Sequence, residues 1–128
     1  MILDSSAIVA ILLREPAHAS LLERLSCDPQ PGAGAPTLAE SATVLVARLG
    51  VSGQTLLARF LQGANVVTVP FSDEHWQVAA HAFARFGKGR HPAALNYGDC
   101  LTYATARLAG EPLLCVGEDF LQTDLELA

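Results

Sequence analysis

A predicted helix with a carboxylate in its first turn, followed at once by a buried strand and an acidic turn, most constrains how this chain can fold. The helix is predicted over residues 96–110, with Asp99 near its start. The strand is predicted over residues 113–116 and runs into Gly117-Glu118-Asp119-Phe120. The expected apolar stripe of the helix consists of Leu101, Ala104, Leu108 and Ala109. A helix that leads into a strand in this way is half of a βαβ-like unit, which collects carboxylates at one edge of a sheet.

The beginning of the chain supplies the other half, because the apolar strand Ile2-Leu3 runs directly into Asp4. Apolar spacing predicts helices over residues 5–14, 17–25, 36–49 and 54–63, and another that begins at residue 72. Further short strands are expected at residues 32–35, 65–69 and 125–127. Strands separated by helices imply a mostly parallel sheet of four or five strands with helices on both faces. The predicted fold class is α/β, in one domain over residues 1–128.

The composition agrees with one folded domain, since 51% of the residues are apolar and only 16% are charged. Cysteines at positions 27, 100 and 115 have no metal-ligand spacing, which favours a reduced, cytoplasmic protein. The apolar start lacks the basic region of a signal peptide, and no run approaches the ~18 apolar residues of a membrane span, so a soluble protein is expected. The net charge of −5 opposes nucleic-acid binding unless a local basic strip or metal ions offset it.

Four carboxylates are candidate site residues by their positions: Asp4, Glu40, Asp99 and Asp119. Each also has an ordinary structural explanation. Asp4 could be a helix N-cap, and Glu40 could complete a capping box with Thr37. Asp99 could complement the helix dipole, and Asp119 could be an ordinary loop acid. However, Asp4 and Asp119 follow apolar strands, and ligands of open α/β sheets bind at that edge. Glu40 and Asp99 are expected in first helical turns, which tend to project over the same edge.

Carboxylates gathered within a few ångströms would repel one another, and Mg²⁺ or Mn²⁺ would remove that conflict. Hard cations prefer carboxylate oxygens and water as ligands, whereas the lack of His and Cys partners argues against zinc. Metal-assisted phosphodiester hydrolysis is the chemistry that suits such a site. Ser6, Asn96 and Thr123 lie near these acids in the sequence and could orient a water or a carboxylate. Each of the three could equally be a cap or turn residue.

Four stretches of the chain carry a family resemblance: Met1-Ile2-Leu3-Asp4-Ser5-Ser6-Ala7-Ile8, Thr37-Leu38-Ala39-Glu40, Asn96-Tyr97-Gly98-Asp99-Cys100-Leu101-Thr102-Tyr103-Ala104 and Gly117-Glu118-Asp119-Phe120-Leu121-Gln122-Thr123-Asp124. In this order and spacing they resemble a PIN-domain ribonuclease and, within that family, the VapC toxin of a VapBC toxin–antitoxin pair. The resemblance implies a PIN-like three-layer α/β/α sandwich and a Mg²⁺- or Mn²⁺-dependent endoribonuclease that cuts cellular RNA. It also implies a homodimer and a cognate VapB antitoxin that blocks the site.

The acidic positions of the family carry over to Asp4, Glu40, Asp99 and Asp119, as metal ligands and catalytic residues. The family often has Asn or Asp at the position of Glu118. Glu118, or even Asp124, could therefore share the role given to Asp119.

Basic residues precede the Asp99 helix at Arg85, Lys88 and Arg90, followed by His91. We expect them to form the basic strip that holds RNA phosphates, with a solvated loop as the alternative. The aromatic residues Trp76, Phe83 and Phe86 have helical spacing, which favours a place in the core or a dimer interface over base stacking.

Two other functions remain open from the residues alone. A metal-dependent phosphatase or phosphotransferase would use Asp4 as its nucleophile, but Ser6 stands where such enzymes usually have a second acid. A non-catalytic PIN-like domain that binds RNA or protein would be expected to lack at least one of the four acids.

Overall fold

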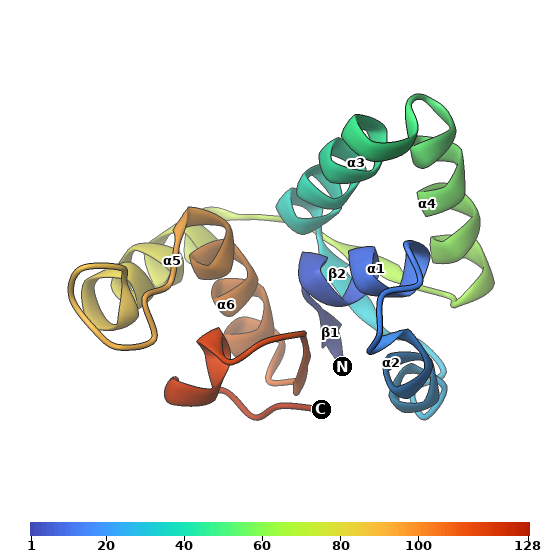
Figure 1. The fold of residues 1–128 in the computed structure, drawn as a ribbon. Coiled ribbons are helices and arrows are strands. Elements are labelled where there is room, and N and C mark those ends of the chain that lie inside the picture. Colours follow the sequence, from blue (N-terminus) through green and yellow to red (C-terminus); the bar gives the residue numbers. More distant parts are fainter.

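A central parallel sheet with helices on both faces organises the chain in the computed structural model, which describes all 128 residues (Figure 1). The strands are β1 (Ile2–Leu3), β2 (Gly32–Gly34), β3 (Val67–Val69) and β4 (Leu113–Leu114). Their order in the sheet is β3-β2-β1-β4, and every neighbouring pair is parallel. The predicted α/β architecture is confirmed, with four strands in the sheet.

Six α-helices form the two outer layers. They are α1 (Ser5–Leu12), α2 (His18–Leu25), α3 (Ala35–Leu49), α4 (Ser52–Gly63), α5 (Asp73–Phe86) and α6 (Tyr97–Ala109). Helices α1 to α4 cover one face of the sheet, and α5 and α6 pack against each other over the opposite face (Figure 1). A short 3₁₀ helix, η1 (Asp119–Gln122), follows β4. None of the helices is long and apolar enough to cross a membrane.

The sheet separates two hydrophobic cores because successive strand residues point to opposite faces. Ile2 and Leu113 pack with α5 and α6, whereas Leu3 and Leu114 pack with the helices of the other face. Leu3, Leu113 and Leu114 are completely buried. Burial of each such side chain stabilises the fold by about 1.5–3 kcal/mol. Strands β1 and β4 thus need only two residues each to contact both helical layers.

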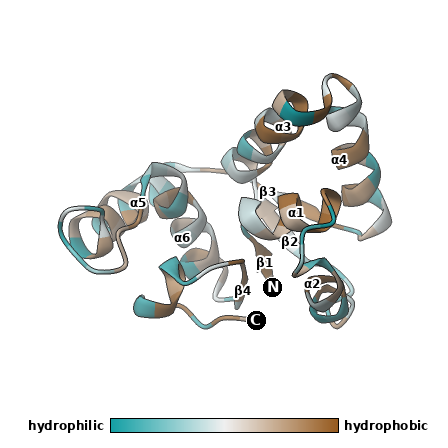
Figure 2. Cartoon of the chain, in the orientation of Figure 1, coloured by the Kyte–Doolittle hydropathy of each residue, from teal (hydrophilic) through white to brown (hydrophobic).

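Helix α1 lies beneath the other helices of its layer and contacts α2, α3 and α4. Figure 2 shows it as hydrophobic over most of its surface, whereas α3 and α4 each have a hydrophilic side. Its buried residues are Ala7, Ile8, Ala10 and Ile11. A helix that is apolar nearly all round is stable only where protein surrounds it. Helix α1 is therefore held firmly in place, and so is Asp4, its N-cap residue.

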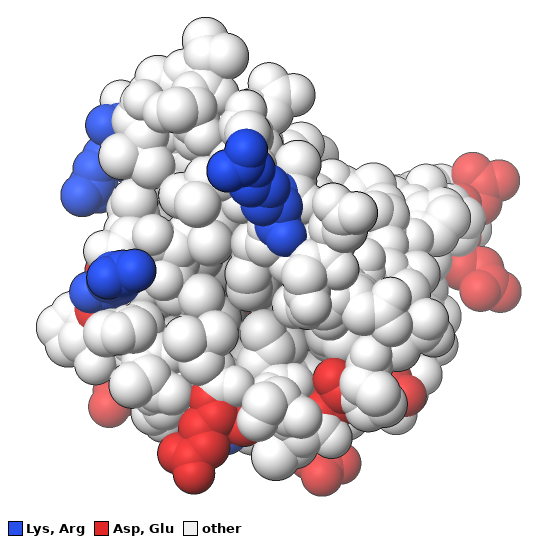
Figure 3. All heavy atoms as spheres, turned by 90° about the vertical axis from the view of Figure 1, so that its right-hand side faces the viewer, with Lys and Arg blue, Asp and Glu red and all other residues white.

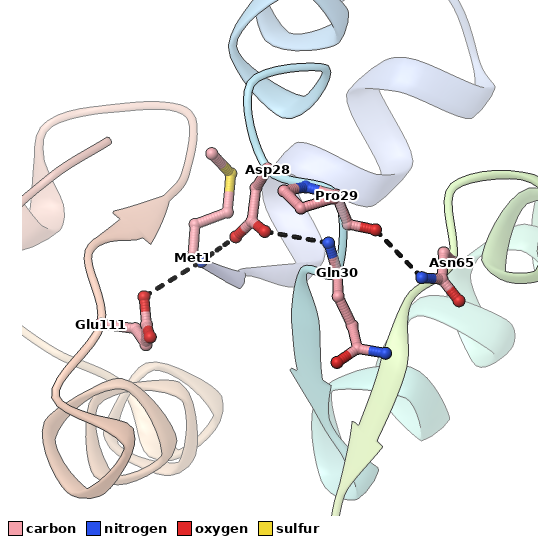
Figure 4. A network of polar contacts seen from close by, with 6 residues as sticks. All are labelled: Met1, Asp28, Pro29, Gln30, Asn65 and Glu111. Carbon is pink, nitrogen blue, oxygen red and sulfur yellow. Dashed lines mark hydrogen bonds and ion pairs between the residues drawn. The ribbon is translucent and has the colours of Figure 1, made fainter.

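Polar contacts join the segments that enter the strands at the amino edge of the sheet (Figure 4). The Met1 ammonium forms ion pairs with Asp28 and, at 3.3 Å, with Glu111. The Gln30 backbone N–H donates to Asp28 Oδ1 over 2.9 Å, and the Asn65 amide donates to the Pro29 carbonyl over 3.0 Å. These contacts bind the starts of all four strands together, at the edge away from the candidate carboxylates.

Some details differ from the sequence prediction. The segment 125–127 makes only an isolated bridge between Leu127 and Leu113, and β4 ends at Leu114. Helix α3 starts at Ala35, so Glu40 lies in its second turn and no capping box with Thr37 forms. Leu108 is exposed, whereas Thr102 and Thr105 are buried in α6. Their hydroxyls find hydrogen-bond partners, which allows these threonines to replace larger apolar residues in the core.

Candidate active site

Asp4 is the candidate site residue with the most restricted position. It follows β1 directly and is the N-cap of α1, so it ends a buried strand and begins a buried helix. Its backbone N–H donates to the Leu114 carbonyl of the neighbouring strand over 2.9 Å. Only 5% of the residue is exposed. The prediction that Asp4 could be a helix N-cap is confirmed. Because Asp4 directly follows β1, its carboxylate lies at the carboxyl edge of the sheet.

Both oxygens of the Asp4 carboxylate accept hydrogen bonds. Oδ2 accepts from the Ser6 backbone N–H at 3.1 Å and from the Ser6 hydroxyl at 2.6 Å. Oδ1 accepts from the Thr102 hydroxyl at 2.8 Å. These three donors fix the orientation of the Asp4 carboxylate.

Asp99 lies in the first turn of α6, as predicted, and forms a capping box with Asn96. The Asn96 N–H donates to Asp99 Oδ2 over 3.0 Å, and the Asp99 N–H donates to Asn96 Oδ1 over 2.8 Å. Burial raises the pKa of Asp99 to about 6, despite the lowering effect of the Asn96 hydrogen bond. The negative charges of Asp4, Asp119 and Glu40 are smaller contributions to the same rise. The fold therefore brings these carboxylates close enough to act on one another.

Glu40 reaches the same place from α3. Its Oε1 accepts the hydroxyl of Ser5, the first residue of α1. On its other side it lies against Gly98 of α6, where the space that a Cβ would need is taken by Glu40 Oε2. Glu40 is itself exposed, so its carboxylate borders both the protein and the solvent. The glycine at this position lets the helix that carries Asp99 approach Glu40.

Asp119 is the first residue of η1 and is exposed to solvent. Its charge contributes to the raised pKa of Asp99 and to that of Cys115. Cys115 itself lies between β4 and this turn, where burial and then the charge of Asp4 raise the pKa of its thiol to about 11. Burial and the nearby carboxylates thus favour the neutral thiol in the metal-free protein.

The chemistry of this donor set suits a hard divalent cation. The donors named here are all carboxylates, whose oxygens are the ligands that such cations prefer. No three His, Cys, Asp or Glu side chains converge here as in a preformed metal site. Burial is the main cause of the raised pKa of Asp99, and the charges of the neighbouring carboxylates add to it; a bound cation would offset that repulsion. Asp4, Glu40, Asp99 and Asp119 are the residues that could hold the ion.

The other acids suggested for this role have different surroundings. The Asp124 carboxylate accepts the Tyr103 hydroxyl at 2.6 Å and forms ion pairs with Arg85 at 3.2 Å and Arg107 at 3.6 Å. The Tyr103 hydrogen bond and then the two arginines hold the pKa of Asp124 below its usual range. Glu118 is exposed and precedes η1 without capping it. The Thr123 hydroxyl donates to the Phe120 carbonyl at 2.7 Å, which closes the same turn.

The three basic residues of the suggested strip differ in their surroundings. Arg85 is engaged with Asp124 and lies over the Phe86 ring at 4.6 Å. Arg90 lies over the Phe83 ring at 5.6 Å, and Lys88 is exposed in the same turn. On the opposite side of the molecule, formed by the α1 to α4 layer, charged side chains are scattered and most of the surface is uncharged (Figure 3).

Reasoning from the sequence missed Thr102, Thr37, Ser5 and Gly98, which contact the acids or one another. The Thr37 and Thr102 hydroxyls lie 3.2 Å apart in the interior. Thr102 follows Asp99 by three residues, which places both on the same side of α6. That spacing was a signal in the sequence, although the partner residues Asp4 and Thr37 are too distant along the chain to be read from it.

Known proteins resemble this chain over almost its whole length. A family model described as the PIN domain matches residues 1–126. Ribonuclease VapC36 of Mycobacterium tuberculosis is 48% identical over 127 residues, which cover 98% of this chain and 91% of that protein. Ribonuclease VapC of Mycolicibacterium smegmatis is 43% identical, with 98% and 97% covered.

Solved structures share the fold at lower identity. M. tuberculosis VapC20, described as a sarcin-ricin loop cleaving toxin, superimposes with a TM-score of 0.81 at 16% identity, covering 99% of this chain and 97% of that chain. VapBC2 from Rickettsia felis, bound to a DNA fragment from its promoter, gives a TM-score of 0.79 at 17% identity, covering 99% and 96%.

Proposed function

The chain belongs to the PIN domain family, and from this premise we propose that it is a metal-dependent endoribonuclease, the toxin of a type II toxin–antitoxin pair. The relatives that are 43% and 48% identical are named VapC ribonucleases and align along nearly their full lengths. One structural observation carries the proposal for this chain. Asp99 has a pKa of about 6 because it is buried beside Asp4, Asp119 and Glu40, at the carboxyl edge of a parallel sheet.

Asp4, Glu40, Asp99 and Asp119 would hold Mg²⁺ or Mn²⁺. When bound, such an ion supplies activation of the attacking water and charge compensation at the scissile phosphate. Asp4 brings a carboxylate that its three hydrogen-bond donors hold in one orientation. Asp99 and Glu40 border the solvent around it, where the RNA backbone would enter. Asp119 is exposed and would bring its carboxylate from the 3₁₀ helix that follows β4.

The geometry is less favourable to a phosphatase that uses Asp4 as a nucleophile. Both Asp4 oxygens are occupied by hydrogen bonds, and only 5% of the residue is exposed. The hydroxyl of Ser6 is committed to the same carboxylate, so Ser6 does not provide the acid–base group that this chemistry requires. Hydrolysis of a phosphodiester by water needs neither an accessible Asp4 nucleophile nor an acid–base group at Ser6.

We propose two kinds of protein partner. A VapB-like antitoxin would block the site, and a second copy of the chain would form a homodimer. Trp76, Phe83 and Tyr97 are 57%, 42% and 79% exposed and surround an apolar hollow of about 240 Å³, which supports an interface at this surface. Phe86, in contrast, is buried in the core. The proposed place of action is the cytoplasm, where the RNA substrate is found.

Inducible expression in a bacterial host tests the proposed function. Production of the parent chain should arrest growth and create new RNA ends at a defined set of sites. Asp99→Asn, produced at the same level, should do neither, and co-expression of the cognate antitoxin should restore growth. Growth arrest by both proteins without new RNA ends would refute the ribonuclease assignment.

A further inference from the structure

We propose that Thr102 and Thr37 form a positioning relay, a pair of buried hydroxyls that holds the Asp4 carboxylate in the orientation that the metal site needs. The inference rests on the proposed function, because Asp4 matters here as a metal ligand. Thr102 contacts Asp4 directly, and Thr37 acts through Thr102. Neither residue is placed to touch the substrate, so both are positioning residues.

The hydrogen bonds of the relay have a defined direction. A threonine hydroxyl has one proton, and the proton of Thr102 goes to Asp4 Oδ1 at 2.8 Å. The bond between Thr37 and Thr102, at 3.2 Å, must therefore be donated by Thr37. The donation by Thr37 polarises the Thr102 hydroxyl and strengthens its bond to the carboxylate. The relay thus runs from Thr37 through Thr102 to Asp4.

A second chain of hydrogen bonds reaches the other Asp4 oxygen. The Ser6 hydroxyl donates to Oδ2 at 2.6 Å and accepts from the Val116 N–H at 3.0 Å. Val116 begins the turn that carries Asp119, whereas Thr102 belongs to the helix of Asp99 and Thr37 to the helix of Glu40. Through its two oxygens, Asp4 is therefore connected to all three elements that carry the other acids.

The Thr102 and Thr37 hydroxyls are buried, and a buried hydroxyl costs free energy unless it forms a hydrogen bond. Thr102 is 1% exposed and Thr37 is 4% exposed. Valine has nearly the same shape and would fill both positions without the cost of taking a hydroxyl out of water. Thr102→Val would, however, remove the hydrogen bond that Thr102 donates to Oδ1 of the buried Asp4 carboxylate.

Thr105 provides a matched control on the same helix. It is also 1% exposed, but its hydroxyl bonds to the Leu101 carbonyl of α6 at 3.1 Å. Thr105→Val removes a buried hydroxyl of the same kind without touching Asp4. Any effect of Thr102→Val on the site that Thr105→Val lacks therefore belongs to the relay and not to the loss of a buried polar group.

The test compares Thr102→Val, Thr102→Ser, Thr37→Val and Thr105→Val with the parent protein. Calorimetry measures the affinity of metal-free protein for Mn²⁺, RNA cleavage gives kcat and KM, and thermal melting reports folding. Thr102→Val should lower Mn²⁺ affinity and kcat by about 10- to 100-fold with little change in KM. Thr102→Ser should restore most of the loss, and Thr37→Val should show a smaller loss of the same kind. Thr105→Val should retain the parent values.

Equal Mn²⁺ affinity and kcat in Thr102→Val and Thr105→Val would overturn the relay. A parent protein that neither binds Mn²⁺ nor cleaves RNA would refute the proposed function. The relay can then still be tested in crystal structures of the metal-free parent and Thr102→Val proteins. In Thr102→Val the Asp4 carboxylate should rotate or occupy more than one orientation. An Asp4 carboxylate in the single parental orientation would refute the relay. If Thr102→Val does not fold, Thr37→Val carries the same comparison.

Discussion

Gly98 lies so close to Glu40 that a Cβ added to it would stand 2.5 Å from Glu40 Oε2. The absence of a side chain at Gly98 thus allows the start of α6 to approach α3. Because Asp99 follows directly, the same contact sets how closely the carboxylates of Asp99 and Glu40 approach each other. The atom in the way is the end of a flexible side chain, so the site, rather than the fold, depends on this glycine.

Gly98→Ala should impair the site while leaving the protein folded. The new methyl group must displace the Glu40 carboxylate, whereas alanine is favoured over glycine within a helix by about 0.5–1 kcal/mol. We expect a melting temperature close to that of the parent and a clear loss of Mn²⁺ affinity. Gly63→Ala in α4 is the control, because a Cβ there meets nothing within 4 Å. Equal Mn²⁺ affinity in both variants would show that Glu40 does not need its present position.

The contribution of Asp99 to the stability of the metal-free protein should fall as the pH rises from about 4 to about 6. Burial and the neighbouring carboxylates raise the pKa of Asp99 to about 6, whereas an unfolded aspartate titrates near 4. Between these values the folded chain binds more protons than the unfolded chain, so the stability contributed below pH 4 is lost by about pH 6. The loss is about 1–3 kcal/mol.

Asp99→Asn isolates this effect because it removes the titrating group. In EDTA at neutral pH the variant should melt at a higher temperature than the parent, and the difference should shrink toward pH 4. Denaturant unfolding across this pH range measures it. Parallel pH profiles for the two proteins would contradict the account of Asp99.

Much of this fold follows from local pattern. Asp4 follows the strand Ile2–Leu3 and caps the next helix, and Asp99 lies in the first turn of a helix, as the sequence predicts. The predicted buried stripe of α6 was wrong at Leu108 and Ala109, which are exposed, whereas Thr102 and Thr105 are buried. Their burial depends on hydrogen-bond partners, and the partner of Thr102 is Asp4, far away in the chain. Contacts of this kind, like that between Gly98 and Glu40, exist only once the helices have packed.

Asp119 and Asp124 should respond differently to neutralisation. Asp124→Asn removes the carboxylate that Tyr103, Arg85 and Arg107 share, and should cost about 1 kcal/mol because the arginines are exposed. Its Mn²⁺ affinity should stay at the parent value. Asp119→Asn should instead weaken Mn²⁺ binding with little change in the melting temperature without metal. The opposite pattern, measured by calorimetry and melting, would assign the fourth ligand to Asp124.

Arg90→Glu should weaken RNA binding without changing the fold, because Arg90 is exposed and free of ion pairs. The Asp99→Asn background prevents cleavage during the measurement. Affinity should fall, and the slope of log K against log salt should decrease by about one for each phosphate that the variant no longer neutralises. Arg59→Glu, the same charge change on α4, is the control. Equal affinities of the two variants would remove Arg90 from the RNA-binding surface.

Cleavage of total RNA by the purified protein tests the central claim most directly, namely that the four carboxylates form one metal-dependent hydrolytic site. The parent should generate discrete fragments with Mg²⁺ or Mn²⁺ and none with EDTA. Asp4→Asn and Asp99→Asn should generate none under any condition, although the latter should be more stable than the parent. Fragments that persist in EDTA, or that Asp4→Asn and Asp99→Asn still produce with metal, would contradict the account.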